Sequence, residues 1–126
     1  MSGNSKVLTG LMERRALEAA FAALAGATSV EEVARHADAI AGYGRAALPA
    51  LVARLDTDDP ALRGGLAQVA RRLDREAVVT ALREVARARN RSDRSRLSAL
   101  TILDRYLEEP VDDSLMAGLQ DSDSVA

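Results

Sequence analysis

The sequence contains no cysteine and no tryptophan, and it has a single histidine, His36. Without cysteine, a disulfide framework, thiol catalysis and a cysteine-ligated zinc site are all excluded. One histidine also argues against a histidine-rich metal site and against a Ser–His–Asp triad. Aromatic residues make up only 2% of the chain. Because valine, isoleucine and aromatic residues are scarce, the composition argues against a β-sheet.

Long hydrophobic runs are also lacking. No window approaches 18 uninterrupted apolar residues, so we expect no transmembrane span and no contact with a membrane. The amino terminus, MSGNSKVLTGLMERR, lacks the apolar stretch of a signal peptide. These absences predict a cytoplasmic protein. No residue pattern indicates a cofactor or a metal ion, and we expect neither.

Alanine and leucine dominate the 48% hydrophobic content of the 126 residues, and both favour helix. Apolar residues recur with helical spacing nearly from end to end, which predicts an all-α protein. Helix start signals stand at Ser29, Asp59 and Asp74, and glycines at 42 and 44 stop a helix. The expected helices cover about 7–25, 29–41, 47–55, 60–73, 75–89 and 94–107, with a last one around Leu115 to Leu119.

The apolar positions repeat. At an offset of 33 residues, Leu66, Val69 and Ala70 match Ala99, Ile102 and Leu103, and a third copy begins at an offset of 64. Such a period is typical of stacked helical pairs. We expect one domain over 1–126, with units at about 6–44, 46–73 and 75–107. Residues 111–126 would begin a further, incomplete repeat.

Residues 46–73 resemble a HEAT repeat, in particular the short, alanine-rich bacterial type. The family pattern has a Leu-Pro-x-Leu first helix, an Asp-Pro turn, and an apolar residue followed by arginine in the second helix. The matching motifs here are Leu48-Pro49-Ala50-Leu51, Asp59-Pro60 and Leu62-Arg63. In the next unit Arg96 is kept, but Ser92-Asp93 replaces Asp-Pro.

This resemblance implies a right-handed α–α superhelix, a HEAT- or armadillo-like solenoid of about three stacked helical pairs. It also implies that Asp59 and Arg63 belong to a ladder of polar contacts between neighbouring repeats. Pro49, Pro60 and Arg96 would likewise serve the repeat structure. Such scaffolds usually bind other proteins and do not catalyse reactions.

The carboxyl end stops where a second helix of the next repeat would begin. A helix without its partner exposes an apolar stripe, whereas solenoids normally end in a polar cap. We therefore expect the chain to be the front segment of a longer repeat protein. Self-association through this last helix is an alternative.

Several residues invite a catalytic or ligand-binding interpretation that the sequence does not support. His36 has no second histidine, cysteine or nucleophile beside it, so a helix-surface position is expected. Two of the acidic pairs 31–32, 108–109 and 112–113 lie at helix starts, where carboxylates complement the helix dipole. Gly64-Gly65 lies within an expected helix and follows no strand, so it is no phosphate loop. Close helix packing or a small concave spot for a partner would explain it.

Arginine carries the remaining functional signal. Residues 71–105 hold ten basic and five acidic residues, whereas 106–126 hold no basic and six acidic residues. We predict that a binding partner is recognised by Arg83, Arg87 and Arg91, which are spaced by four residues, and by Arg94. An acidic protein partner would suit them. The alternative is binding of a nucleic-acid backbone through residues 83–96, as in some HEAT-like glycosylases, although stacking aromatics are missing and the net charge is negative. A HEAT-like lyase or glycosylase activity has no supporting residues.

Overall fold

The computed structural model describes residues 2–110, with side chains from residue 10 onward, and this part of the chain is helical without any β-strand. None of its helices is long and apolar enough to cross a membrane. The expected unit at 111–126 and its helix around Leu115 lie outside the described residues. The elements are α1 (Ser2–Ala25), α2 (Val30–Ala41), η1 (Gly44–Ala46), α3 (Ala47–Ala53), α4 (Pro60–Arg72), α5 (Arg75–Arg87), α6 (Asp93–Thr101) and η2 (Ile102–Tyr106).

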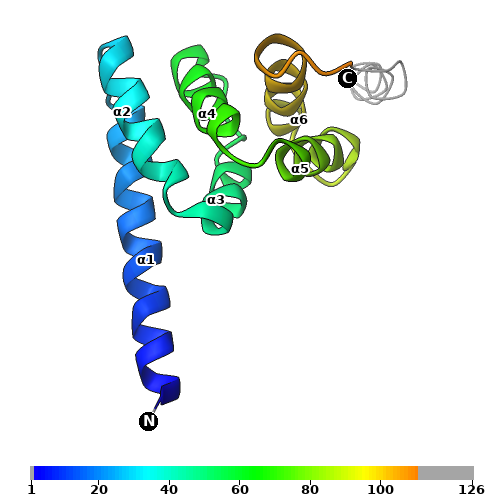
Figure 1. The fold of residues 1–126 in the computed structure, drawn as a ribbon. Helices are drawn as coiled ribbons and strands as arrows, with labels where there is room; N and C mark the ends of the chain where they lie inside the picture. Colours follow the sequence, from blue (N-terminus) through cyan, green and yellow to red (C-terminus); the bar gives the residue numbers. More distant parts are fainter. Residues whose placement is uncertain (1, 111–126) are drawn as a thin grey trace.

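Helices adjacent in sequence form three pairs, α1–α2, α3–α4 and α5–α6, that follow one another across the molecule (Figure 1). The first helices contact in series, α1 with α3 and α3 with α5. The second helices do the same, because α2 contacts α4 and α4 contacts η2, which continues α6. Helix α1 is the exception in length, since its amino-terminal half extends beyond α2 (Figure 1). Residues 10–16 on that half are exposed.

The start of α2 follows the expected capping pattern with one difference. The Glu32 backbone N–H donates to Ser29 Oγ at 3.1 Å, as predicted. The Glu32 carboxylate accepts from the backbone N–H of Thr28 at 3.0 Å, outside the helix. That hydrogen bond stabilises the ionised carboxylate and lowers the pKa of Glu32. The two contacts satisfy one N–H inside the helix and one just before it.

The starts of α4, α5 and α6 are capped in the same way. Asp59 accepts from the backbone N–H of Ala61, Asp74 from that of Ala77, and Ser92 from that of Ser95, at 2.9–3.1 Å. Each side chain thereby supplies an acceptor to a backbone N–H that has no partner within its own helix. Ser92 and Asp59 are 33 residues apart, so Ser92 caps its helix at the equivalent position of the unit at 75–107. The predicted start signals at Asp59 and Asp74 are confirmed.

The hydrophobic core follows the predicted repeat. The pairs Leu66/Ala99, Val69/Ile102 and Ala70/Leu103 are buried at both members, which confirms that the 33-residue offset relates equivalent helix faces. Leu97 is not part of this core, because 46% of its surface on α6 is exposed. The arrangement buries mostly alanine, valine and leucine, and Phe21 is the one aromatic residue in the buried core of the described residues.

The last helix ends in a wide turn that the sequence pattern did not predict. Residues Ile102–Tyr106 form a π-helix, and the Leu107 N–H donates to Ile102 O at 3.0 Å. The Glu109 N–H then donates to Leu103 O at 2.9 Å, and Glu108 has a positive φ of 54°. A non-glycine residue in this left-handed conformation is strained.

Gly64 and Gly65 lie side by side on α4 but face different neighbours. A Cβ on Gly65 would lie 3.2–3.5 Å from three atoms of Leu24, a buried side chain of α1. A Cβ on Gly64 would meet only the hydroxyl of Tyr106, at 3.3 Å. Close packing of α4 against α1 therefore explains why residue 65 is glycine. At residue 64 a larger side chain would meet only the Tyr106 hydroxyl, the end of a half-buried side chain that can shift.

We expect Gly64→Ala to stabilise the protein by about 0.5–1 kcal/mol, because alanine favours helix over glycine. Gly65→Ala gains the same helix propensity but overpacks Leu24, which costs about 1–3 kcal/mol, so a net destabilisation of about 1 kcal/mol is expected. Urea unfolding followed by circular dichroism measures both variants. Equal effects of the two substitutions would contradict the packing of Gly65 against α1.

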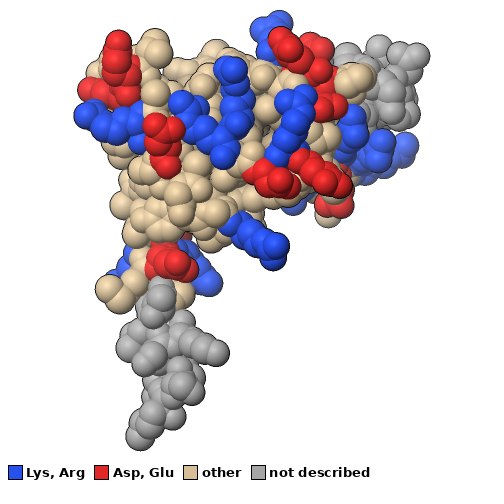
Figure 2. Space-filling model, in the orientation of Figure 1, with Lys and Arg blue, Asp and Glu red and all other residues tan. Residues whose placement is uncertain are grey.

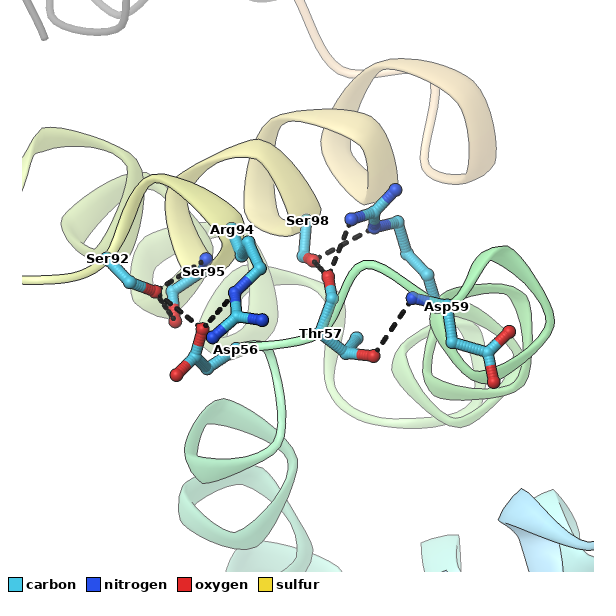
Figure 3. A network of polar contacts seen from close by, with 8 residues as sticks. Asp56, Thr57, Asp59, Ser92, Arg94, Ser95 and Ser98 are labelled. Atoms are coloured by element: carbon cyan, nitrogen blue, oxygen red, sulfur yellow. Dashed lines mark hydrogen bonds and ion pairs between the residues drawn. The ribbon is translucent and has the colours of Figure 1, made fainter. Parts of the chain in front are cut away.

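Polar contacts join the second and third helical pairs (Figure 3). Asp56, in the segment between α3 and α4, accepts from the Ser92 hydroxyl at 2.8 Å and from Arg94 at 3.0 Å. Arg63 on α4 donates to the Ser98 hydroxyl at 2.9 Å and to the Thr57 carbonyl at 2.7 Å. Between the first and second pairs, Arg72 on α4 forms a hydrogen bond and an ion pair with Asp38 on α2. Most of these links connect residues 34–38 positions apart, close to the repeat length.

Candidate interaction surface

The first helices form one face, and its most distinctive feature is the shortness of α3. This helix has seven residues, between α1 with 24 and α5 with 13. It follows Gly44, whose φ of +64° turns the chain, and it ends before the polar segment at 56–59. A helix of two turns covers only about 10 Å of its longer neighbours. Hollows therefore remain along both sides of α3.

The hollow between α1 and α3 has a volume of about 410 Å³. Leucine, proline and alanine side chains line it together with charged groups of both signs. Arg54 is held in place, since its guanidinium lies 4.4 Å from the centre of the Phe21 ring and donates to Ala50 O at 2.9 Å. The lining residues are Gly10, Glu13, Arg14, Leu17, Glu18, Ala46, Pro49, Ala50, Ala53 and Arg54.

Two further hollows separate α3 from α5. The larger, of about 780 Å³, is lined by Ala41, Gly44, Arg45, Leu48, Arg72, Leu73, Asp74, Ala77 and Val78. The smaller, of about 470 Å³, is lined by Leu48, Pro49, Val52, Ala81, Glu84, Val85, Ala88, Asn90 and Arg91. Both share Leu48, and the smaller one shares Pro49 with the α1–α3 hollow. The three hollows thus adjoin one another around α3.

The four predicted recognition arginines do not form one continuous ridge. Arg83 forms an ion pair with Glu109 at 3.5 Å, and Arg94 forms one with Asp56 at 3.0 Å. Arg91 lies beyond the end of α5, beside Glu84 in the smaller α3–α5 hollow. Arg87 is exposed at the carboxyl end of α5. On the face drawn in Figure 2, basic side chains over α4, α5 and α6 are interleaved with acidic ones.

The residues of the HEAT-like motif have different surroundings in the structure. Pro60 is the first residue of α4, where its missing N–H leaves no hydrogen bond unmade. Arg63 links the second and third pairs, as the resemblance implies, whereas Asp59 caps its own helix and Asp56 contacts the next pair in its place. Arg96 is 2% exposed and donates to Ala86 O at the end of α5. Pro49 is exposed between two hollows.

No metal centre is found among the described side chains of residues 10–110. In that range no group of three or more His, Cys, Asp and Glu residues is placed to hold a metal ion. His36 lies half-buried on α2. Every buried side-chain nitrogen and oxygen of the described residues has a hydrogen-bond partner.

Sequence reasoning missed the hollows, although a signal for them was present. The segment between Gly44 and the polar run at 56–59 is too short for a helix as long as its neighbours. Comparisons with protein-family models, with curated proteins and with solved structures found no match to this chain. The surface must therefore be interpreted from its own residues.

Proposed function

We propose that this chain is a non-enzymatic scaffold of HEAT-like helical repeats, stacked as a right-handed superhelix, which binds a protein partner on the face of α1, α3 and α5. One observation carries the proposal: three adjoining hollows, each lined by apolar residues and by charged residues of both signs, surround α3. Apolar area provides the driving force for association, and charges at the rim select the partner. The repeated joints between pairs support the solenoid.

Binding of nucleic acid through residues 83–96 has less support. Of the six arginines in this range, Arg83 and Arg94 are engaged by Glu109 and Asp56, and Arg96 is buried. Glu84 lines the same hollow as Arg91. A nucleic-acid surface needs several unpaired cations and gains from stacking aromatics. Neither Tyr43 nor Tyr106 lies within residues 83–96.

Site-specific photo-crosslinking tests the protein-binding face. A benzoylphenylalanine residue at Pro49, between the hollows, is expected to give an adduct of discrete mass in cells of the source organism. The same residue at Asp104, which is exposed on η2 and lines none of the hollows, is the control and should not give this adduct. Adding Ala53→Arg, which places a large cation over the α1–α3 hollow, should reduce the Pro49 adduct at least tenfold. Equal labelling from both positions would contradict the proposal.

Titration with a short DNA duplex at two salt concentrations tests the alternative. We expect no micromolar binding, because the arginines of residues 83–96 are largely paired or diluted by carboxylates. The matched variant carries R83E, R87E, R91E and R94E. Micromolar binding that weakens steeply with salt and disappears in this variant would replace the protein-binding proposal with a nucleic-acid one.

A further inference from the structure

A fourth hollow, of about 470 Å³, lies where the end of α4, the start of α5 and η2 meet, and it differs in character from those around α3. Three arginines from these three elements line it: Arg71, Arg75 and Arg105. Ala70, Leu73, Tyr106, Leu107 and Glu108 complete the lining. Guanidinium groups gathered around one concave space repel one another, and a bound anion relieves that repulsion.

The three arginines are not equally engaged. Arg75 donates to the Leu107 carbonyl, and two of its N–H groups contact Glu109 Oε1 at 3.0 and 2.7 Å. Arg71 and Arg105 are exposed and have no hydrogen-bond or ion-pair partner within residues 10–110. Within the described residues, two guanidinium groups without a bound carboxylate therefore line the hollow beside one that holds Glu109.

The backbone around this hollow is unusual. Arg105 and Tyr106 belong to the π-helical turn, and Glu108 has its strained positive φ directly after it. π-turns and strained residues are frequent at functional sites. Beneath Tyr106, Gly64 leaves room for its hydroxyl. Arg105 thus reaches the hollow from a π-helical turn, and Arg71 reaches it from the end of α4.

We infer that this hollow binds the carboxylates of an acidic peptide segment through Arg71 and Arg105. Arginine binds carboxylates through charge-assisted N–H donors, and Arg75, two of whose N–H groups donate to Glu109 Oε1, shows such a contact at this hollow. Glu108 in the lining opposes a doubly charged phosphate more strongly than a singly charged carboxylate. Two available arginines match a segment that carries more than one Asp or Glu. The inference extends the proposed function to a second face, and it does not depend on the hollows around α3.

A fluorescein-labelled hexaglutamate peptide, titrated against the full chain at low salt, tests the inference by fluorescence anisotropy. R71A/R105A is expected to weaken binding at least tenfold. R87A/R89A removes the same charge from exposed arginines outside this hollow, and it should change binding less than twofold. Circular dichroism confirms that both variants fold.

Three results would overturn the inference. Absence of peptide binding at low salt is one, and equal weakening in both double variants, which indicates non-specific attraction, is another. The third is displacement of the peptide by inorganic phosphate at a lower concentration than by glutarate, which would assign the hollow to phosphate. Crosslinking from Pro49 should be unchanged in R71A/R105A, so failure here and failure of the proposed function are distinguishable.

Discussion

Leu51→Ala is expected to lower the free energy of unfolding by about 3–4 kcal/mol, the largest single effect we predict. Leu51 is fully buried, and it lies on the short helix α3, which contacts α1, α4 and α5. Truncation removes apolar contact and leaves a cavity where the three helical pairs meet. The free energy of unfolding of a small domain is about 5–15 kcal/mol, so this substitution would remove a large part of it. Chemical denaturation followed at 222 nm measures the loss.

Leu97→Ala is the matched control for this prediction, because it deletes the same atoms from a leucine with 46% exposure on α6. We expect a loss below about 1 kcal/mol there. If the two variants lose similar stability, α3 does not occupy the centre of the core.

Arg63→Ala should cost about 2 kcal/mol, the second largest effect. Its guanidinium links the Thr57 carbonyl and the Ser98 hydroxyl, and Ser98 is fully buried. Removing a donor from buried acceptors costs about 1–3 kcal/mol. Arg63→Lys should restore little, because one ammonium group lacks the planar fork that reaches both acceptors.

The corresponding joint between the first and second pairs provides the comparison. Arg72 pairs with Asp38, whose side chain is 71% exposed. Exposed ion pairs contribute about 0–1 kcal/mol, so Arg72→Ala is expected to cost less than 1 kcal/mol in the same denaturation experiment. A larger loss at Arg72 than at Arg63 would show that surface charge, rather than the buried hydroxyl, holds the joints.

Much of the fold was predictable because its signals are local. A cap such as Asp59 or Ser92 acts on a backbone N–H two or three residues away, and the 33-residue offset relates core positions through helical periodicity. The right-handed superhelix stays a proposal that rests on the resemblance and on the contacts between pairs. The wide turn at Ile102–Tyr106 was missed because a π-turn and an α-turn place similar apolar residues inward.

The candidate sites were less predictable, because they depend on contacts between distant residues. Helical spacing grouped Arg83, Arg87 and Arg91, but α5 ends at Arg87, and Glu109 engages Arg83 from 26 residues away. Arg71 and Arg105 are 34 positions apart and meet only because α4 lies beside η2. No local pattern distinguishes these arginines from the others in the chain.

The ion pairs at the joints have a consequence for how the molecule bends. Arg72 with Asp38 and Arg94 with Asp56 connect consecutive helical pairs at the surface, where dissolved ions reach them. At physiological salt, charges are screened over about 8 Å, and in dilute buffer the range is several times longer. Salt therefore weakens these surface ion pairs, while the apolar packing within and between the helical pairs is retained. We expect the joints between pairs to bend more readily at high ionic strength than in dilute buffer, which changes the surface presented to a binding partner.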